Sequence, residues 1–310
     1  MKQITNTILM VRPAAFRSNE QTKVNNFFQE DLDLQLEEIN DRAQNEFDTF
    51  VEKLKNVGVE VIVFQDEKEN DTPDSIYPNN WISFHQSGNV ALYPMFAENR
   101  RRERNEEVLQ LIESKGYSIE NIIDYSEAEN DNLFLEGTGS LILDRENRKA
   151  YCALSARADE ELLIEFCEDF EYTPVIFTAY QTVKNQREII YHTNILMCIG
   201  DKFCIICLDT IDDKTEKKNI VAHLKEDNKE IITITEEQMH HFAGNMLQVI
   251  GDRGKSYLVM SQSAKECLSE DQINTIERYT KILSSDLHTI ETLGGGSARC
   301  MMAEVFLPKN

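Results

Sequence analysis

The stretch Gly294-Gly295-Gly296-Ser297-Ala298-Arg299-Cys300-Met301-Met302-Ala303-Glu304 organises the rest of the chain. Three consecutive glycines accept backbone angles that other residues avoid, and they let a ligand approach the main chain closely. Successive backbone N–H groups in such a turn can also bind an anion. The apolar residues around and after the thiol predict a buried strand over Cys300–Phe306. A buried structural cysteine behind an ordinary turn would produce the same local pattern.

A faint internal repeat runs back from this stretch through the whole chain. Each unit consists of a hairpin, a helix and a return strand, and the second hairpin strands lie near residues 93, 151, 204 and 257. The last three of these positions are 53 residues apart. The first unit shows a strand at Ile8–Arg12, a helix at Glu37–Asn56 and a strand at Val59–Phe64, without a hairpin partner of its own.

Five such units predict a closed ring of ββαβ units. A single unit cannot bury its hydrophobic face, whereas stacked neighbours can. The strand at the C-terminus would then pair with Ile8–Arg12 and close the ring, which also removes exposed sheet edges. An open, mixed α/β sheet fits the same order of elements. No linker rich in proline, glycine or serine divides the sequence, so we expect residues 1–310 to form one domain.

Composition excludes several classes of partner. The 310 residues include 32 Lys and Arg against 55 Asp and Glu, so the net charge is −23 and neither nucleic acid nor an anionic membrane is a favourable partner. No apolar run reaches membrane-spanning length, and the N-terminus lacks a hydrophobic signal region. Seven irregularly spaced cysteines favour a reducing compartment. We expect a soluble, cytoplasmic protein, either monomer or homodimer, that binds a small molecule.

Three residues that can carry chemistry each precede the first strand of a unit. Glu136 lies in Leu135-Glu136-Gly137-Thr138-Gly139-Ser140, and His192 lies in Tyr191-His192-Thr193-Asn194. Taken singly, they are explained as a surface carboxylate and a structural histidine. In a ring, however, equivalent positions converge on one end of the central axis. Together with Cys300 they then form a thiol nucleophile, an imidazole acid–base group and an orienting carboxylate.

Other polar residues have both a local and a functional explanation. Asp74 lies in a turn fixed by prolines and asparagines, where turn chemistry alone accounts for it. Arg157 follows a hairpin, and it is either a surface charge or a fork for a substrate carboxylate. The basic run Arg100–Arg104 predicts a solvated helix start. Cys204 and Cys207 lie in a hydrophobic strand without flanking histidines, which indicates buried thiols.

No cofactor motif is complete. Gly137-Thr138-Gly139 lacks the third glycine and the following helix of a dinucleotide-binding fingerprint. His240 and His241 are adjacent, so on a helix their side chains diverge and would not chelate one metal ion. We expect neither a metal nor a cofactor.

The motifs resemble the pentein superfamily, which comprises arginine deiminases, dimethylarginine dimethylaminohydrolases and amidinotransferases. The resemblance spans nearly the whole chain. It rests on Val11-Arg12-Pro13, Pro73-Asp74, Leu135-Glu136-Gly137, His192 before a strand, and Cys300 behind glycines. More narrowly, the chain is similar to the bacterial citrulline-utilisation hydrolases in Pro78-Asn79-Asn80-Trp81, Glu136-Gly137-Thr138-Gly139-Ser140, His192-Thr193-Asn194 and the stretch 294–300.

The resemblance implies a five-fold pseudosymmetric α/β propeller, with residues 1–310 as one pentein catalytic domain. It implies Cys300 as the nucleophile and His192 as the general acid and base, with Glu136 assisting. Arg157 matches an arginine that holds the substrate α-carboxylate in the dimethylarginine enzymes. Members that hydrolyse guanidines commonly have aspartates where this chain has Asn80 and Asn194.

These two asparagines indicate a neutral substrate. A carboxylate is the natural partner of a guanidinium, whereas an amide offers one acceptor and one donor, which suits a ureido group. A cation facing two amides would lose about 1.5–3 kcal/mol for each charge-assisted hydrogen bond. The paired change therefore points from arginine toward citrulline.

We expect a cysteine-dependent hydrolase of C–N bonds that converts citrulline to ornithine, ammonia and carbon dioxide through a covalent Cys300 adduct. Contacts with the amino-acid substrate are expected from Asp74, Asn80, Arg157 and Asn194. Three alternatives stay open: an arginine deiminase or dimethylarginine-type guanidine hydrolase, an amidinotransferase, and a non-enzymatic binding protein of the same fold. The group of Cys300, His192 and Glu136 argues against the last.

Overall fold

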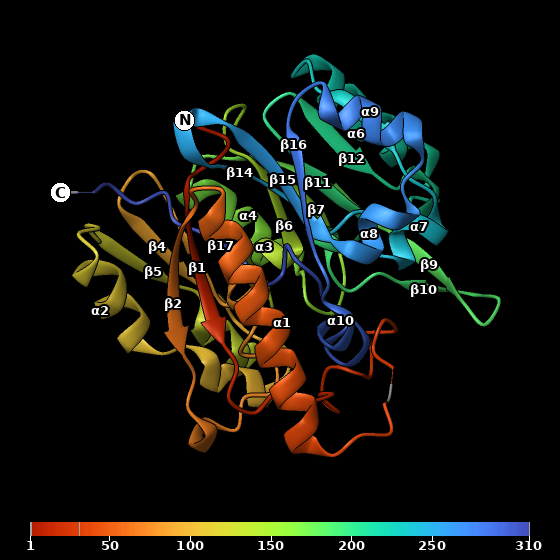
Figure 1. Ribbon diagram of the computed structural model, residues 1–310. Helices are drawn as coiled ribbons and strands as arrows, with labels where there is room; N and C mark the ends of the chain where they lie inside the picture. Colours follow the sequence, from red (N-terminus) through yellow and green to blue (C-terminus); the bar gives the residue numbers. More distant parts are fainter. Residues whose placement is uncertain (1, 31, 310) are drawn as a thin grey trace.

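The computed structural model describes residues 2–30 and 32–309, and five three-stranded sheets organise it (Figure 1). In each sheet the first strand pairs antiparallel with the middle strand, which pairs parallel with the third. The sheets are β17 (Ala303–Glu304), β1 (Thr7–Arg12) and β2 (Glu60–Gln65); β3 (Ile82–Phe84), β4 (Asn89–Leu92) and β5 (Asn121–Asp124); β6 (Leu141–Asp144), β7 (Lys149–Ala153) and β8 (Thr173–Phe177); β11 (Met197–Ile199), β12 (Phe203–Ile206) and β13 (Glu230–Thr233); β14 (Leu247–Ile250), β15 (Ser256–Ser261) and β16 (Lys281–Ser285).

A helix connects the second and third strands of every sheet, so each sheet is the expected ββαβ unit. The connecting helices are α1 (Leu36–Asn56), α2 (Glu106–Ser114), α4 (Glu160–Asp169), α6 (Lys214–Glu226) and α9 (Glu270–Glu277). Four of them begin at a residue whose side chain accepts a backbone N–H of the first turn, as a good N-cap does. These caps are Asn105, Asp159, Asp213 and Ser269.

The C-terminal strand completes the first unit, which confirms the predicted closure between the two ends of the chain. β17 pairs antiparallel with β1, with Ile8 opposite Glu304 and Leu9 opposite Ala303. The N–H of Val305 then donates to the carbonyl of Thr7 at 2.9 Å. The fold is therefore the predicted five-fold α/β propeller. None of the described helices has the length and apolarity needed to span a membrane.

Several local expectations were wrong. Cys300 was expected on the closing strand, but that strand begins at Ala303 and Cys300 lies in the preceding turn. The short helices α3 (Gly137–Ser140) and α5 (Thr193–Leu196) separate Glu136 and His192 from the strands that follow them. A further hairpin, β9 (Tyr180–Val183) with β10 (Gln186–Ile189), was not expected and projects beside the fourth unit (Figure 1).

In the fifth unit the helix α9 ends at Glu277 and β16 is the return strand. The segment after β16 forms a further helix, α10 (His288–Gly294). The carboxylate of Glu46, on α1, accepts the N–H groups of Thr289 and Ile290 at 2.9 and 3.1 Å. This contact satisfies two N–H groups at the start of α10, and it joins residues more than 240 positions apart.

Truncating the Leu9 side chain tests the packing between β1 of the first unit and the neighbouring second unit. Leu9 is fully buried and packs with Trp81 and Ile82 of the second unit. We expect Leu9→Ala to lower the free energy of unfolding by about 2–5 kcal/mol, because it leaves a cavity between two units. The same substitution at Leu36, which is 63% exposed, should change it by less than about 0.5 kcal/mol. Chemical denaturation measures both, and equal effects would contradict this packing role.

Candidate active site

Cys300 and His192 line one cavity, and Glu136 lies behind His192. Glu136 and His192 each stand directly before a four-residue helix that leads into the first strand of a unit, so the ring brings them to the same end. The Oε2 of Glu136 lies 2.7 Å from the Nε2 of His192. The residues that line the cavity are Thr22, Asn26, Asp74, Tyr77, Asn80, Arg100, Arg157, Tyr191, His192, Gly294, Gly296 and Cys300.

Two amide groups contact the thiol of Cys300. Its Sγ accepts from the Nδ2 of Asn194 at 3.3 Å and from the Nδ2 of Asn245 at 3.2 Å. Asn194 was predicted as a substrate contact, and the structure places its amide against the sulfur. Asn245 was not predicted as a site residue. A signal for it existed, because Asn245 precedes the first strand of the fifth unit, as Glu136 and His192 precede those of the third and fourth. The Oδ1 of Asn194 has no hydrogen-bond partner in the described part of the chain.

The Glu136–His192 pair carries an ionised carboxylate and a neutral imidazole. Burial alone would raise the pKa of Glu136, but Arg157, His192 and Arg100 hold it well below its usual range. Burial lowers the pKa of His192 to about 4, against the opposing effect of Glu136. Because an ionised carboxylate only accepts, Nε2 is the protonated nitrogen of His192 and Nδ1 is left as a base.

Gly139 leaves the room that His192 and Asn80 need. A Cβ at this position would lie 2.8 Å from the Nδ1 of His192 and 2.5 Å from the Nδ2 of Asn80. Contacts this short are not tolerated, so both side chains would have to move. The structure therefore explains Gly139 by the space that His192 and Asn80 occupy, and a phosphate-binding role is not needed to explain it.

The basic run Arg100–Arg104 is not a solvated helix start, because Arg100 is buried. It lies in a 3₁₀ helix, Glu98–Glu103, and pairs with Glu103 through two hydrogen bonds of 2.8 and 2.9 Å. Its Nη1 donates to the Oδ1 of Asn80 at 2.9 Å and lies 3.7 Å from Glu136. Periodicity could not reveal this role, since only the tertiary fold places these acidic and amide groups around one arginine.

The Asn80 amide is held on both sides. Its Oδ1 accepts from Arg100, and its Nδ2 donates to the Oδ1 of Asn79 at 3.0 Å. Asn80 therefore presents a fixed amide to the cavity, with one N–H of its Nδ2 remaining.

Asp74 and Arg157 meet the loop that follows β1. The Oδ2 of Asp74 accepts from Asn19 at 2.8 Å and from Thr22 at 3.3 Å, whereas its Oδ1 has no hydrogen-bond partner among the described residues. Burial raises the pKa of Asp74, against the effect of Arg100. The Arg157 guanidinium donates to the carbonyl of Thr22 at 3.0 Å and to the side chain of Asn25.

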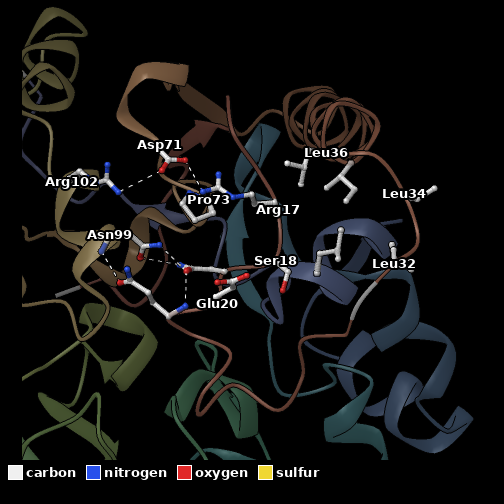
Figure 2. A pocket seen from close by; sticks show the side chains of 14 residues that line it. Arg17, Ser18, Glu20, Leu32, Leu34, Leu36, Asp71, Pro73, Asn99 and Arg102 are labelled. Atoms are coloured by element: carbon white, nitrogen blue, oxygen red, sulfur yellow. Dashed lines mark hydrogen bonds and ion pairs between the residues drawn. The ribbon is translucent and has the colours of Figure 1, made fainter.

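The loop over residues 13–30 covers the cavity and is anchored to the second unit. Arg17 pairs with Asp71 at 2.7 Å, and Asn99 donates to the Oδ1 of Asn19 at 2.8 Å (Figure 2). A second pocket lies beside this loop, with these polar groups on one side and the leucines 32, 34 and 36 on the other. The loop thus supplies both a cover and polar contacts to the site.

The glycine stretch is held by hydroxyl and amide donors. The hydroxyl of Tyr191 donates to the carbonyl of Gly295 at 2.6 Å, and that of Tyr77 donates to Ile290 at 3.2 Å. Gly295 has a φ of 63°, in the left-handed region. A Cβ at Gly294 would lie 2.0 Å from the Tyr77 hydroxyl, so this position accepts only glycine.

The neutral state of His192 makes a prediction about acid stability. An unfolded histidine titrates near pH 6.5, whereas the folded one titrates near 4, so the unfolded state binds more protons between these values. Stability should therefore fall as pH drops through this window. We expect wild type to lose about 3 kcal/mol relative to His192→Gln between pH 7 and 4. Denaturant titrations at several pH values measure the difference, and parallel curves would contradict it.

A family model described as "N,N dimethylarginine dimethylhydrolase, eukaryotic" matches residues 12–307. No curated protein sequence matches the chain significantly. Among solved structures, ArgZ, an arginine dihydrolase from the ornithine–ammonia cycle in cyanobacteria, is similar with a TM-score of 0.74 and 17% identity. The match covers 98% of this chain and 41% of that one, so this chain spans about two-fifths of the length of ArgZ.

Two further structures match over their full length. The N-terminal domain of ArgZ with product bound has a TM-score of 0.70 at 17% identity, and the match covers 97% of this chain and 99% of that domain. A dimethylarginine dimethylaminohydrolase has a TM-score of 0.61 at 13% identity, with coverage of 97% and 99%. The TM-scores show the shared pentein fold, and the family model covers nearly the whole chain. The chain therefore belongs to the N,N-dimethylarginine dimethylhydrolase family of the pentein superfamily.

Proposed function

We propose that the protein is a thiol-dependent ureido hydrolase that converts citrulline to ornithine, ammonia and carbon dioxide. One observation carries the proposal: the Cys300 sulfur accepts hydrogen bonds from two uncharged amides, Asn194 and Asn245, beside a neutral His192. In this proposal Cys300 is the nucleophile, His192 the general base and acid, and Glu136 the group that orients the imidazole.

The proposed reaction begins with transfer of the Cys300 proton to the Nδ1 of His192. The sulfur attacks the ureido carbon, and the imidazolium returns its proton to the departing nitrogen, which leaves as ammonia. The carbonyl carbon remains bonded to the sulfur and to the δ-nitrogen of the ornithine skeleton. Water, deprotonated by the same imidazole, attacks this adduct and the C–S bond breaks. The released N-carboxylate loses carbon dioxide and leaves ornithine.

The carboxylate of Glu136 is already occupied by hydrogen bonds within the protein, which favours a substrate with a neutral side chain. Both oxygens of Glu136 already accept hydrogen bonds: Oε1 accepts from the N–H of Phe96 at 3.0 Å and Oε2 from His192. The contacts of Cys300 Sγ are amides, and the unpartnered Oδ1 of Asn194 can accept an N–H of a ureido group. A guanidinium near the sulfur would meet amides where it requires carboxylates.

The charged residues of the cavity support an amino-acid substrate. Asp74 has a buried carboxylate oxygen without a partner, which suits an α-ammonium group. The guanidinium of Arg157 lines the same cavity and can form a paired contact with an α-carboxylate. The loop carbonyl of Thr22 and the amide of Asn25 now accept from Arg157, so the loop must shift for that contact to form.

The chain from residue 1 to residue 310 is proposed to act as one catalytic domain. Thr22 and Asn26, from the loop after β1, line the same cavity as Cys300 near the other end of the chain. Removing the chain up to Asn26, or from Cys300 onward, would therefore remove part of the site.

A guanidine hydrolase that acts on arginine or a methylarginine is the second candidate. Family membership favours it, and so does the unpartnered oxygen of Asp74, which a guanidinium could use in place of an α-ammonium. The two candidates share the nucleophile. They differ in whether Asp74 contacts the α-ammonium group or the guanidinium of the substrate.

A substrate panel distinguishes the two candidates. Purified protein is incubated with citrulline, arginine, the methylarginines and agmatine, and ammonia, ornithine and citrulline are quantified in the same samples. Ammonia and ornithine from citrulline would support the proposal. Citrulline formed from arginine or a methylarginine would overturn the choice of substrate and establish the second candidate.

Replacing the thiol tests the nucleophile. Cys300→Ala should lower kcat by more than about 10³-fold, because the covalent step is lost, while the thermal unfolding midpoint changes little. Cys267→Ala is the matched control, since Cys267 lies on α8 (Gln262–Cys267) away from the cavity and should be dispensable for turnover. Substantial turnover by Cys300→Ala would contradict the mechanism.

Asn194→Asp tests the choice between ureido and guanidinium groups. A carboxylate at this position should lower kcat/KM for citrulline by about tenfold or more, the equivalent of one hydrogen bond to the substrate. The ratio of arginine to citrulline turnover should rise at the same time. Steady-state kinetics with both substrates measures this ratio, and an unchanged ratio would show that Asn194 does not select the substrate.

A further inference from the structure

The side chain of Asn245 has a single possible orientation. Its Oδ1 accepts the backbone N–H of Arg299 at 3.0 Å, so its Nδ2 must face the opposite way. That Nδ2 donates to the carbonyl of Asn194 at 3.0 Å and to the Sγ of Cys300 at 3.2 Å. Exchanging oxygen and nitrogen would place two donors against each other at the Arg299 N–H and two acceptors against each other at the Asn194 carbonyl. The amide is fully buried and satisfied at both of its polar atoms.

Asn194, the other amide at the sulfur, is held differently. Its Nδ2 donates to Sγ at 3.3 Å, but its Oδ1 has no partner in the described part of the chain. The Oδ1 of Asn194 is therefore an acceptor that an N–H group of a substrate could use. Asn245 cannot turn without losing the N–H of Arg299 and the carbonyl of Asn194.

A reactive thiol requires its anionic form to be stabilised. The cation that commonly does this is a protonated histidine, but His192 is neutral and its Nε2 is bound to Glu136. Hydrogen bonds to an anion are about twice as strong as those between neutral groups. The two amide donors are therefore the groups in contact with Sγ that favour the thiolate.

We propose that Asn245 is a catalytic residue that stabilises the Cys300 thiolate through its Nδ2–H donor at each step in which the sulfur is anionic. This inference rests on Cys300 being the nucleophile. Both polar atoms of Asn245 are engaged, whereas Asn194 donates to the sulfur and keeps an unpartnered Oδ1 among the described residues. Both amides are uncharged, so they stabilise the anion without adding a charge of their own beside the incoming ureido group.

The test measures the pH dependence of Cys300 alkylation by iodoacetamide, quantified by mass spectrometry on the peptide that contains Cys300. Asn245→Ala should move the half-maximal pH upward by about one unit relative to wild type, since one hydrogen bond to the anion is lost. Alkylation below that midpoint should then be about tenfold slower. The other titratable groups near the sulfur stay the same in both proteins: Asp74, Tyr77, Arg100, Glu136, Arg157, Tyr191 and His192.

Two further variants separate the sulfur contact from a structural role. Ser297→Ala removes a loop anchor, the hydrogen bond of 2.5 Å to Glu291, without contacting sulfur, and it should leave the midpoint unchanged. Asn245→Asp keeps an acceptor for Arg299 but replaces the donor with an oxygen, so it should raise the midpoint at least as much as the alanine variant. If Asn245→Ala does not fold, Asn245→Asp decides the outcome.

An unchanged midpoint in both Asn245 variants would overturn the proposal, and so would an equal rise in Ser297→Ala. Alkylation needs no substrate, so this result is independent of the substrate panel. If the protein turns over citrulline but the Asn245 variants leave the alkylation midpoint unchanged, only the proposed role of Asn245 is wrong. A shift in a protein that turns over no member of the panel would keep Asn245 as a thiolate donor and remove the proposed substrate.

Discussion

The pairing of β17 with β1 is the interaction on which the candidate site depends. It joins the last described strand to the first, and so carries Cys300 to the end of the ring where Glu136, His192 and Asn245 lie. Each of these residues precedes the first strand of a different unit. Because the ring repeats one geometry, equivalent positions in sequence become neighbours in space. The site is therefore a consequence of the symmetry of the fold and of its closure.

Burial of charge is the second constraint. Asp74, Arg100, Glu136 and Arg157 are all buried, which costs free energy unless each ionised group is paired and hydrogen-bonded. Arg100 meets this condition through Glu103 and Asn80, and Glu136 meets it through His192 and the N–H of Phe96. Among the described residues around the site, the buried oxygens without a hydrogen-bond partner are Asp74 Oδ1 and Asn194 Oδ1. In an otherwise satisfied network, such acceptors are where the N–H groups of a substrate would bind.

The family model and the solved structures support different levels of the description. The family model spans residues 12–307 and establishes the family, whereas the solved structures share the fold at 13–17% identity. The proposed role of the amides at positions 80 and 194 in specificity rests on their contacts in this structure, with Arg100 and with the Cys300 sulfur.

The sequence by itself determined the repeat, the family resemblance and the choice of Glu136, His192, Asn194 and Cys300 as candidate site residues, because hydrophobic periodicity and local motifs lie within short stretches of sequence. Tertiary structure decided what depends on contacts between distant segments. Arg100 looked like part of a solvated basic run, and only the fold surrounds it with Glu103, Asn80 and Glu136. Helix α10 begins where Glu46 caps it, and Asn245 contacts a sulfur 55 positions away. Such contacts are set by how the units pack, and no local pattern encodes them.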